Sequence, residues 1–460
     1  MIEQATIAVS PAKSQHSGIR PAANLSGIRP AARGVPEHLQ QQLKSNVHKD
    51  LIKRVDLERL GTMTEDRNKQ HQLFAVIQQL VTEQGVPLSS VERDRISQEV
   101  LDEVFGFGPL EPLLNDPTVS DILVNTYSHV YVERKGVLEL SNVVFKDNKH
   151  LMQIIDKIVS GVGRRVDESS PLCDARLPDG SRVNVVIPPL AVDGPILSIR
   201  KFGTKPLTAE DLLRFGAMTQ PMLDVLQGAV KARLNIVVSG GTGSGKTTLL
   251  NVLSGFISPY ERIVTIEDSA ELQVKQEHVV RLETRPPNVE GNGAVRQREL
   301  VINALRMRPD RIILGEVRGE ETMDMLQAMN TGHDGSLTTI HSNTPRDAIA
   351  RMETMAMMGS VALPEKAIRA QIAAAVHVIV QASRMSDGSR RITHITEITG
   401  ATAEVVSMND IFLFEKKGLG PGGKVKGRFF ATGVMPRFAE KLIAAGFPLS
   451  TSLMDHSQEV

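Results

Sequence analysis

The stretch GGTGSGKTT, residues 240–248, decides the fold of this chain. Gly240, Gly245, Lys246 and Thr247 occupy the defining positions of the pattern G-x-x-x-x-G-K-[ST]. The apolar run NIVV precedes this loop and the helical run KTTLLNVL opens from it, which is the context that the pattern requires. In such a loop, backbone N–H groups turn inward around phosphate oxygens, and the start of the helix adds partial positive charge. The sequence therefore predicts that the chain binds a nucleoside triphosphate.

The loop residues have separate expected roles. We expect Lys246 to reach the β- and γ-phosphates and the Thr247 hydroxyl to bind Mg²⁺. A glycine-rich turn without a ligand is the alternative, and the order of strand, loop and helix argues against it. The residues predicted to contact the nucleotide are Gly240, Gly241, Thr242, Gly243, Ser244, Gly245, Lys246, Thr247 and Thr248.

The bulk properties limit the other possibilities. With 460 residues the chain exceeds what one hydrophobic core usually holds, so we expect two or three folded units. Its 53 basic and 53 acidic residues cancel, which leaves no overall attraction to nucleic acid or anionic lipid. Cys173 is the only cysteine, which excludes a disulfide framework and favours a reducing cytoplasm. Because no apolar run approaches the length of a membrane span, a role at a membrane would depend on partner proteins.

Changes in residue pattern divide the chain. Ser, Pro, Gly and Ala dominate the first segment, where SGIRPAA occurs at Ser17 and again at Ser26, either as a docking motif or as a neutral linker expansion. Helical periodicity follows, then short alternating strands, then strands that alternate with helices as in a parallel sheet. We therefore predict a disordered tail over residues 1–36, a helical domain over 37–105 and an α+β domain over 106–205. An α/β domain over 206–408 and a loosely packed tail over 409–460 follow.

An acidic segment follows one predicted strand of the α/β domain. TIEDSAEL, residues 265–272, carries Glu267, Asp268 and Glu271. Carboxylates at the end of a strand beside the phosphate loop can order Mg²⁺ or polarise a water molecule for in-line attack. A solvated acidic loop is the alternative.

A second acidic position departs from the common pattern of phosphate-loop enzymes. IILGEVRG, residues 312–319, has Gly315 where most of these enzymes carry the magnesium-binding aspartate. Glu316 is the remaining carboxylate, and we expect it to hold the ion through water. The departure argues against common kinases, small GTPases and transporter cassettes.

The segment TGHDGSLTTIHSN, residues 331–343, places His333 and His341 eight residues apart. No regular metal spacing fits this pair, and cysteine support is absent. Imidazole and hydroxyl groups can hydrogen-bond a terminal phosphate and register its loss, so we predict a phosphate sensor. A pair of structural histidines is the alternative.

Together these residues resemble the secretion and pilus-assembly ATPases of the type II/type IV secretion superfamily. Within it the chain looks like the CpaF type, the tight-adherence (Tad, Flp) pilus motor. The resemblance covers roughly residues 40–410. The matching boxes are Walker A at Gly240–Thr247, the aspartate box at Glu267, Asp268 and Glu271, the atypical Walker B at Gly315–Glu316, and the histidine box at Thr331–His341.

This resemblance implies a fold and a set of reacting groups. The expected fold class is α/β, with a RecA-like P-loop NTPase domain behind a smaller α+β N-terminal domain and a helical N-terminal extension. The implied ligands are ATP and Mg²⁺, with the ion at Thr247 and Glu316. In the family the last acid of the aspartate box is thought to activate water, so Glu271 takes that role here. Glu316 would be the second catalytic acid, and Lys246 and Glu267 complete the predicted catalytic set.

Resemblance to ring ATPases also gives a meaning to an arginine-rich stretch. Residues 281–311 hold seven arginines, four acids and no lysine. Arginine forks bind phosphate bidentately, and an arginine from a neighbouring subunit can complete a nucleotide site. Arg281, Arg296 and Arg306 are the candidate arginine fingers. Ordinary ion pairs are the alternative for most of the seven, and a nucleic-acid patch is disfavoured because no aromatic residues interleave with them.

The resemblance finally implies a homo-oligomeric ring, a hexamer, at the cytoplasmic face of the inner membrane. Such a ring would hydrolyse ATP to power assembly of a Tad/Flp pilus or protein secretion through an inner-membrane platform protein. Zero net charge and very few aromatic residues argue against direct binding of nucleic acid. One alternative is a conjugation or nucleic-acid translocation ATPase of the same superfamily. Another is a nucleotide-dependent scaffold that barely hydrolyses ATP.

Overall fold

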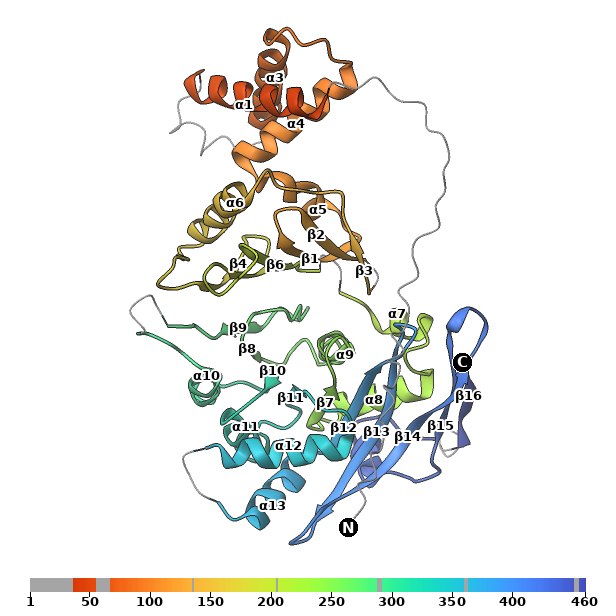
Figure 1. Ribbon diagram of the computed structural model, residues 1–460. Coiled ribbons are helices and arrows are strands. Elements are labelled where there is room, and N and C mark those ends of the chain that lie inside the picture. Colours follow the sequence, from red (N-terminus) through yellow and green to blue (C-terminus); the bar gives the residue numbers. More distant parts are fainter. Residues whose placement is uncertain are drawn as a thin grey trace, which may run out of the picture. The chain divides into compact units, whose positions relative to one another are not determined.

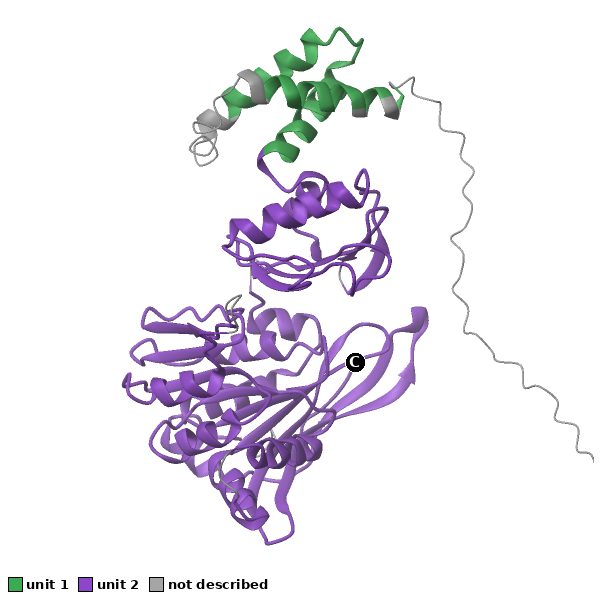
Figure 2. Cartoon of the chain, turned by 60° about the vertical axis from the view of Figure 1, so that its left-hand side comes forward, with its two compact units in different colours: residues 1–104 green, residues 105–460 purple. Residues whose placement is uncertain are grey.

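A computed structural model describes residues 36–54, 67–134, 136–203, 206–287, 292–359, 363–450 and 455–460. The SGIRPAA repeat lies outside these residues. The chain forms two compact units, residues 1–104 and 105–460 (Figure 2). In the described part of the chain, no helix has both the length and the apolar character needed to cross a bilayer.

The first unit is helical, as its periodicity predicts. Its helices carry apolar side chains every three or four residues, and Val47, Leu51, Ile77, Leu80 and Val81 are fully or almost fully buried. These side chains give the unit a hydrophobic core of its own. The helices are α1 (Glu37–Arg54), α3 (Arg67–Glu83) and α4 (Ser90–Phe105).

The second unit begins with an antiparallel sheet of order β3-β2-β1-β6-β5-β4, and its apolar face packs on α6 (Figure 1). The turn Pro178-Asp179-Gly180 joins β4 to β5, and Gly180 there has a φ of 90°, which glycine adopts without strain. The elements are η1 (Gly108–Leu110), α5 (Glu111–Asn115), α6 (Asn148–Gly161), β1 (Val119–Thr126), β2 (His129–Arg134), β3 (Val137–Leu140), β4 (Leu172–Arg176), β5 (Arg182–Val186) and β6 (Ile196–Arg200).

A larger sheet follows, with the order β16-β15-β14-β13-β12-β7-β11-β10-β8-β9 in the described residues. Strands β12 to β9 in this order are parallel, which confirms the predicted α/β class. The parallel strands are β7 (Ile236–Gly240), β8 (Ile263–Glu267), β9 (Val279–Glu283), β10 (Arg311–Val317), β11 (Leu337–Ile340) and β12 (Val378–Arg384).

Helices cover both faces of the parallel part of this sheet, and β7, β8 and β11 are buried at every residue. Successive residues of β7 show this directly, since Ile236 and Val238 belong to one hydrophobic cluster and Val237 to another. The first cluster includes α8 and α9, and the second includes α10 to α13. These helices are α7 (Ala209–Arg214), α8 (Gln220–Lys231), α9 (Lys246–Ser254), α10 (Gln297–Ala304), α11 (Glu321–Asn330), α12 (Pro345–Met357) and α13 (Glu365–Ala375).

The C-terminal segment corrects one expectation. Instead of a loosely packed tail from Asn409, antiparallel strands extend the large sheet, and Phe412 and Phe429 are fully buried in its core. The glycines and lysines that suggested loose packing are concentrated around the turn between β14 and β15. The elements are β13 (Arg390–Ala401), β14 (Val406–Leu419), η2 (Pro421–Gly423), β15 (Val425–Ala431), α14 (Ala439–Ala444) and β16 (Ser457–Glu459).

Candidate nucleotide site

The glycine-rich loop joins β7 to α9, as its sequence predicts. Gly243 and Gly245 have φ values of 67° and 95°, which turn the backbone between strand and helix. A Cβ on Gly240 would lie 2.4 Å from the Ser244 hydroxyl oxygen and 2.5 Å from the carbonyl oxygen of Ala382, so no larger residue fits there. The loop therefore has the compact shape that brings N–H groups around a phosphate.

A cavity of about 1420 Å³ opens above this loop. Its walls include all four sequence boxes, because β7, β8, β10 and β11 are parallel and their carboxyl ends meet at one edge of the sheet. Gly240 and Gly241 belong to the loop but do not line the cavity. The predicted residues that do so are Thr242, Gly243, Ser244, Gly245, Lys246, Thr247, Thr248, Glu267, Asp268, Glu271, Glu316 and His341.

Lys246 lies half-buried at the base of this cavity, and its Nζ donates to the carbonyl oxygen of Gly241 at 3.1 Å. Burial lowers the pKa of Lys246, Arg318 lowers it further, and Glu316 opposes both effects. A lysine held by a single neutral acceptor in this setting is ready to exchange that acceptor for a phosphate oxygen.

Glu267 is only 3% exposed and supports the aspartate-box loop. One carboxylate oxygen accepts the backbone N–H groups of Glu271 at 2.8 Å and Leu272 at 2.9 Å. Burial raises the pKa of Glu267, and these two hydrogen bonds partly offset the rise. Glu267 was predicted as a catalytic residue, but its contacts suit a positioning role beneath Glu271.

Packing explains why position 315 is a glycine. A Cβ at this position would lie 2.9 Å from Cγ of Glu267, which is too close for either side chain to stay in place. The Gly315 carbonyl oxygen accepts from the Thr339 hydroxyl of the neighbouring strand at 2.7 Å. The aspartate common at this position is therefore replaced by a glycine that makes room for the buried glutamate.

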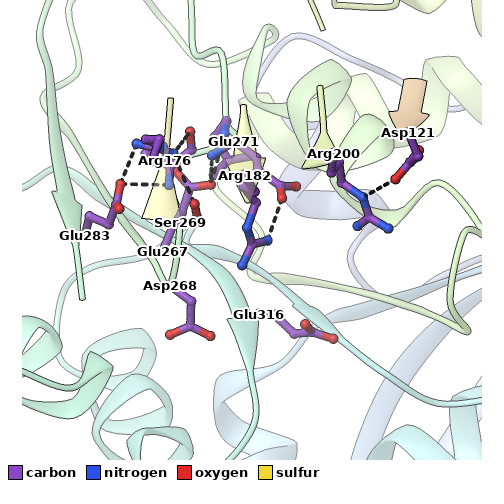
Figure 3. Close-up of polar contacts among 12 residues, drawn as sticks. Asp121, Arg176, Arg182, Arg200, Glu267, Asp268, Ser269, Glu271, Glu283 and Glu316 are labelled. Carbon is purple, nitrogen blue, oxygen red and sulfur yellow. Dashed lines mark hydrogen bonds and ion pairs between the residues drawn. The ribbon is translucent and has the colours of Figure 1, made fainter. Parts of the chain in front are cut away.

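The other two predicted acids are held by arginines. Glu271 bonds Arg182 of β5 at 2.6 Å, so its partner comes from the smaller sheet (Figure 3). Glu316 accepts from the guanidinium of Arg318, which also reaches Asp268. Glu271, Glu316 and Asp268 thus each have an arginine within hydrogen-bond distance, whereas among the described residues Glu267 accepts only backbone N–H groups.

The two histidines do not lie together, which corrects the predicted pair. His341 follows β11 and lines the cavity. His333 precedes β11, at the opposite edge of the parallel strands. A strand of this length separates the two residues by roughly 13 Å. Only His341 can therefore contact a phosphate bound at the loop of its own chain.

None of the predicted arginine fingers lines the nucleotide cavity of its own chain. Arg281 lies on β9 and donates to the carbonyl oxygen of Ala270 at 3.3 Å. Arg296 lies 3.6 Å from Glu320 and lines a second cavity, of about 1340 Å³. Arg306 is exposed just after α10. Action on a neighbouring subunit stays a prediction for all three.

Other arginines of the same stretch form ion pairs within the chain, as the alternative interpretation allows. Arg298 joins Glu320 at 3.2 Å and Asp324 at 2.9 Å. Arg311 is buried and bonds Glu261 at 2.7 Å. These arginines support the fold rather than a ligand.

Sequence analysis identified Lys246 but missed the arginines that line the cavity. Two of them, Arg182 and Arg200, come from β5 and β6 of the smaller sheet, far away in sequence from the loop. A neighbouring contact links the same sheet to β9, where Arg176 bonds Glu283 at 2.6 Å (Figure 3). The cavity arginines are Arg182, Arg200, Arg318, Arg351, Arg390 and Arg391.

The residues present fit a magnesium ion bound together with a nucleotide. Thr247 and Glu316 line the same cavity and offer a hydroxyl and a carboxylate, both oxygen donors. The described residues contain no cluster of three or more His, Cys, Asp or Glu side chains suited to a metal. Mg²⁺ needs no such cluster, because phosphate oxygens and water fill most of its positions.

Known proteins resemble the region that contains this cavity. The profile of a family described as "Type II/IV secretion system protein" matches residues 103–411. A putative conjugal transfer protein of Mycobacterium tuberculosis is 40% identical over 66% of this chain and 87% of its own length. The type IV secretion system protein PtlH of Bordetella pertussis is 35% identical over 62% and 92%. The crystal structure of the VirB11 ATPase from the Brucella suis type IV secretion system is 29% identical, with a TM-score of 0.35, over 64% of this chain and 97% of that one.

Proposed function

This chain belongs to the type II/IV secretion system protein family, and we propose that it is a Mg²⁺-dependent ATPase that works as a homo-oligomeric ring, a hexamer. The ring acts at the cytoplasmic face of the inner membrane and powers assembly of a Tad/Flp pilus, or protein secretion, through a platform protein. The observation that carries the proposal is the single cavity in which Lys246, Glu271, Glu316 and His341 meet.

The reaction is in-line attack of water on the γ-phosphate. Glu271 orients the water and accepts its proton, while Lys246 and the arginines neutralise the charge that spreads over the phosphate oxygens. Mg²⁺, when bound through Thr247 and Glu316, supplies further positive charge at these oxygens. His341 donates a hydrogen bond to the terminal phosphate and loses it when the phosphate leaves.

The nucleobase has an apolar wall in the same cavity. Leu207, Leu212, Phe215, Ala217 and Ile392 line one part of it. Apolar side chains of this kind pack against the faces of a purine ring. The triphosphate then points toward Lys246.

The smaller sheet couples hydrolysis to movement. Arg182 and Arg176 connect it to the acids Glu271 and Glu283 of the ATPase domain. Loss of the γ-phosphate changes the charge that Arg182 faces, so the balance between its partners changes. That change shifts the two sheets relative to each other, and the platform protein receives the motion.

The first test is ATP hydrolysis by the purified chain with saturating Mg²⁺. The unaltered protein should release phosphate, and Lys246→Ala should abolish nucleotide binding. Glu271→Gln should lower kcat by about 10²- to 10⁴-fold, the usual contribution of a general base, and leave nucleotide affinity nearly unchanged. Tight binding with no measurable hydrolysis in the unaltered protein would favour the scaffold alternative instead.

The ring has its own test. Hydrolysis per chain should rise steeply with protein concentration if neighbouring subunits complete each site. A constant rate, combined with a monomeric mass in solution, would contradict both the ring and the arginine fingers in trans. A constant rate with a hexameric mass would indicate a ring that is already assembled.

A second candidate function is a conjugation motor, which the name of the putative conjugal transfer relative from Mycobacterium tuberculosis favours. The balanced net charge and the scarcity of aromatic residues, 3% of the chain, weigh against direct binding of a nucleic-acid strand. Single- and double-stranded DNA should therefore leave the hydrolysis rate unchanged. A several-fold stimulation by DNA would select the conjugation motor.

A further inference from the structure

One arginine joins two acids of the nucleotide cavity. The guanidinium of Arg318 donates to the same oxygen of Glu316 from Nε at 2.8 Å and from Nη2 at 2.5 Å. Its third nitrogen, Nη1, donates to Asp268 at 3.0 Å. Because β8 and β10 are neighbouring strands, this side chain bridges their carboxyl ends.

Arg318 is positioned on the cavity side of this bridge. Its side chain is 58% exposed, whereas that of Glu316 is 19% exposed. It lines the cavity together with Lys246, and its charge acts on the Lys246 ammonium. A terminal phosphate placed by Lys246 would therefore approach a guanidinium that already faces the open space.

We propose that Arg318 senses the terminal phosphate in its own chain: without it the guanidinium holds Glu316 and Asp268, and with it the guanidinium turns to the phosphate and releases Glu316. The inference rests on the proposed function, and it assigns one cavity arginine a specific role in contacting the phosphate. It also differs from the predicted fingers, since Arg318 lies outside residues 281–311.

The exchange follows from charge and geometry. A γ-phosphate carries more negative charge than a carboxylate and presents several acceptor oxygens, so it competes for a guanidinium bound to two carboxylates. Release frees the Glu316 oxygen that accepts two of the hydrogen bonds. A diphosphate offers no oxygen at this place, so after hydrolysis the guanidinium returns to Glu316. The acid is thus available only while a triphosphate is bound.

The decisive measurement is the ratio of dissociation constants for two fluorescent nucleotides, a non-hydrolysable ATP analogue and ADP. Arg318→Gln should weaken binding of the ATP analogue by about tenfold or more, the contribution of a charge-assisted hydrogen bond, and leave ADP binding nearly unchanged. The ratio for Arg318→Lys should lie between those of the unaltered protein and Arg318→Gln, because lysine keeps the positive charge but loses the forked guanidinium.

Arg298→Gln is the matched control. Arg298 also bridges two acids, Glu320 and Asp324, but it does not line the nucleotide cavity. This variant should reduce thermal stability and leave the ratio unaltered. An unchanged ratio in Arg318→Gln would overturn the proposal while the proposed ATPase stands. Failure of the unaltered protein to bind either nucleotide would contradict both the role of Arg318 and the proposed ATPase function.

Asp268→Asn approaches the same exchange from the other side and serves if Arg318→Gln does not fold. It removes one competitor for the guanidinium, so binding of the ATP analogue should strengthen several-fold relative to ADP. A ratio that stays the same or falls would contradict the exchange.

Discussion

Gly315 and Glu267 are so close that each determines what the other can be. A Cβ on Gly315 would lie 2.9 Å from Cγ of the buried glutamate. We expect Gly315→Ala to lower the free energy of unfolding by about 1–3 kcal/mol, the usual cost of overpacking a filled site. Urea unfolding measures the change directly.

The matched control is Gly161→Ala, because no atom lies within 4 Å of a Cβ placed there, at the end of α6. This variant should unfold within about 0.5 kcal/mol of the unaltered protein. If Gly315→Ala is equally harmless, the steric explanation of the unusual Walker B box is wrong.

The raised pKa of Glu267 predicts a pH-dependent effect on stability. Burial raises the pKa of this carboxyl above its ordinary value in the unfolded chain. Its favourable contribution is therefore complete below the unfolded pKa and is lost as pH rises through the folded pKa. Glu267→Gln removes this titration and keeps an oxygen for the two N–H groups. The melting temperature of the variant minus that of the unaltered protein should therefore increase as pH rises from about 4 to about 7.

Thermal melts across this pH range test the prediction, with the exposed Glu404→Gln as the reference variant. The melting-temperature difference between Glu404→Gln and the unaltered protein should not change with pH. A melting-temperature difference for Glu267→Gln that is flat, or that falls as pH rises, would mean that Glu267 ionises in the folded protein at least as readily as in the unfolded chain.

At the scale of elements, the β14–β15 hairpin carries part of the core. Phe429 is fully buried, and the centroid of its ring lies 4.7 Å from the centroid of the Phe414 ring. Phe429→Ala should therefore lower the free energy of unfolding by about 3–5 kcal/mol. Leu419→Ala on the same hairpin is the control, since Leu419 is 63% exposed. Similar small effects of both variants would show that the hairpin does not contribute to the core.

The same hairpin shows what sequence could and could not predict. Buried parallel strands such as β7 and β10 contain short continuous apolar runs, IVV at 236–238 and IIL at 312–314, so their type and place are visible in the sequence. Around the β14–β15 turn, glycine and lysine mask the buried phenylalanines on either side, so the composition predicts a loose tail there. A composition average hides a pattern that alternates residue by residue.

The residues of the nucleotide cavity also divide into those that the sequence predicts and those that it does not. Lys246, Glu271 and His341 follow parallel strands or their loops, and Glu316 lies near the carboxyl end of β10, so a shared edge of the sheet brings the four together. Arg182 reaches Glu271 across 89 residues of sequence, and no local pattern indicates that contact. The direction of a strand also matters, because it separates His333 from the cavity although both histidines lie in one short motif.

At the scale of the whole molecule, each compact unit has its own hydrophobic core. The three large clusters of buried residues lie entirely within residues 105–460, and the helices of the first unit bury Val47, Leu51, Ile77 and Leu80. The family profile begins at residue 103, close to the boundary between the units. The second unit therefore contains both the cores and the cavity that nucleotide binding requires.

We expect a chain restricted to residues 105–460 to fold cooperatively and to bind nucleotide as the full chain does, because removal of the first unit takes no side chain from the cavity. The dissociation constant for the fluorescent ATP analogue should change by less than about twofold. Calorimetry of the same sample should show one sharp transition. Aggregation or a broad transition would contradict the independence of the units. A sharp transition with lost affinity would instead mean that the helical unit acts on the nucleotide site.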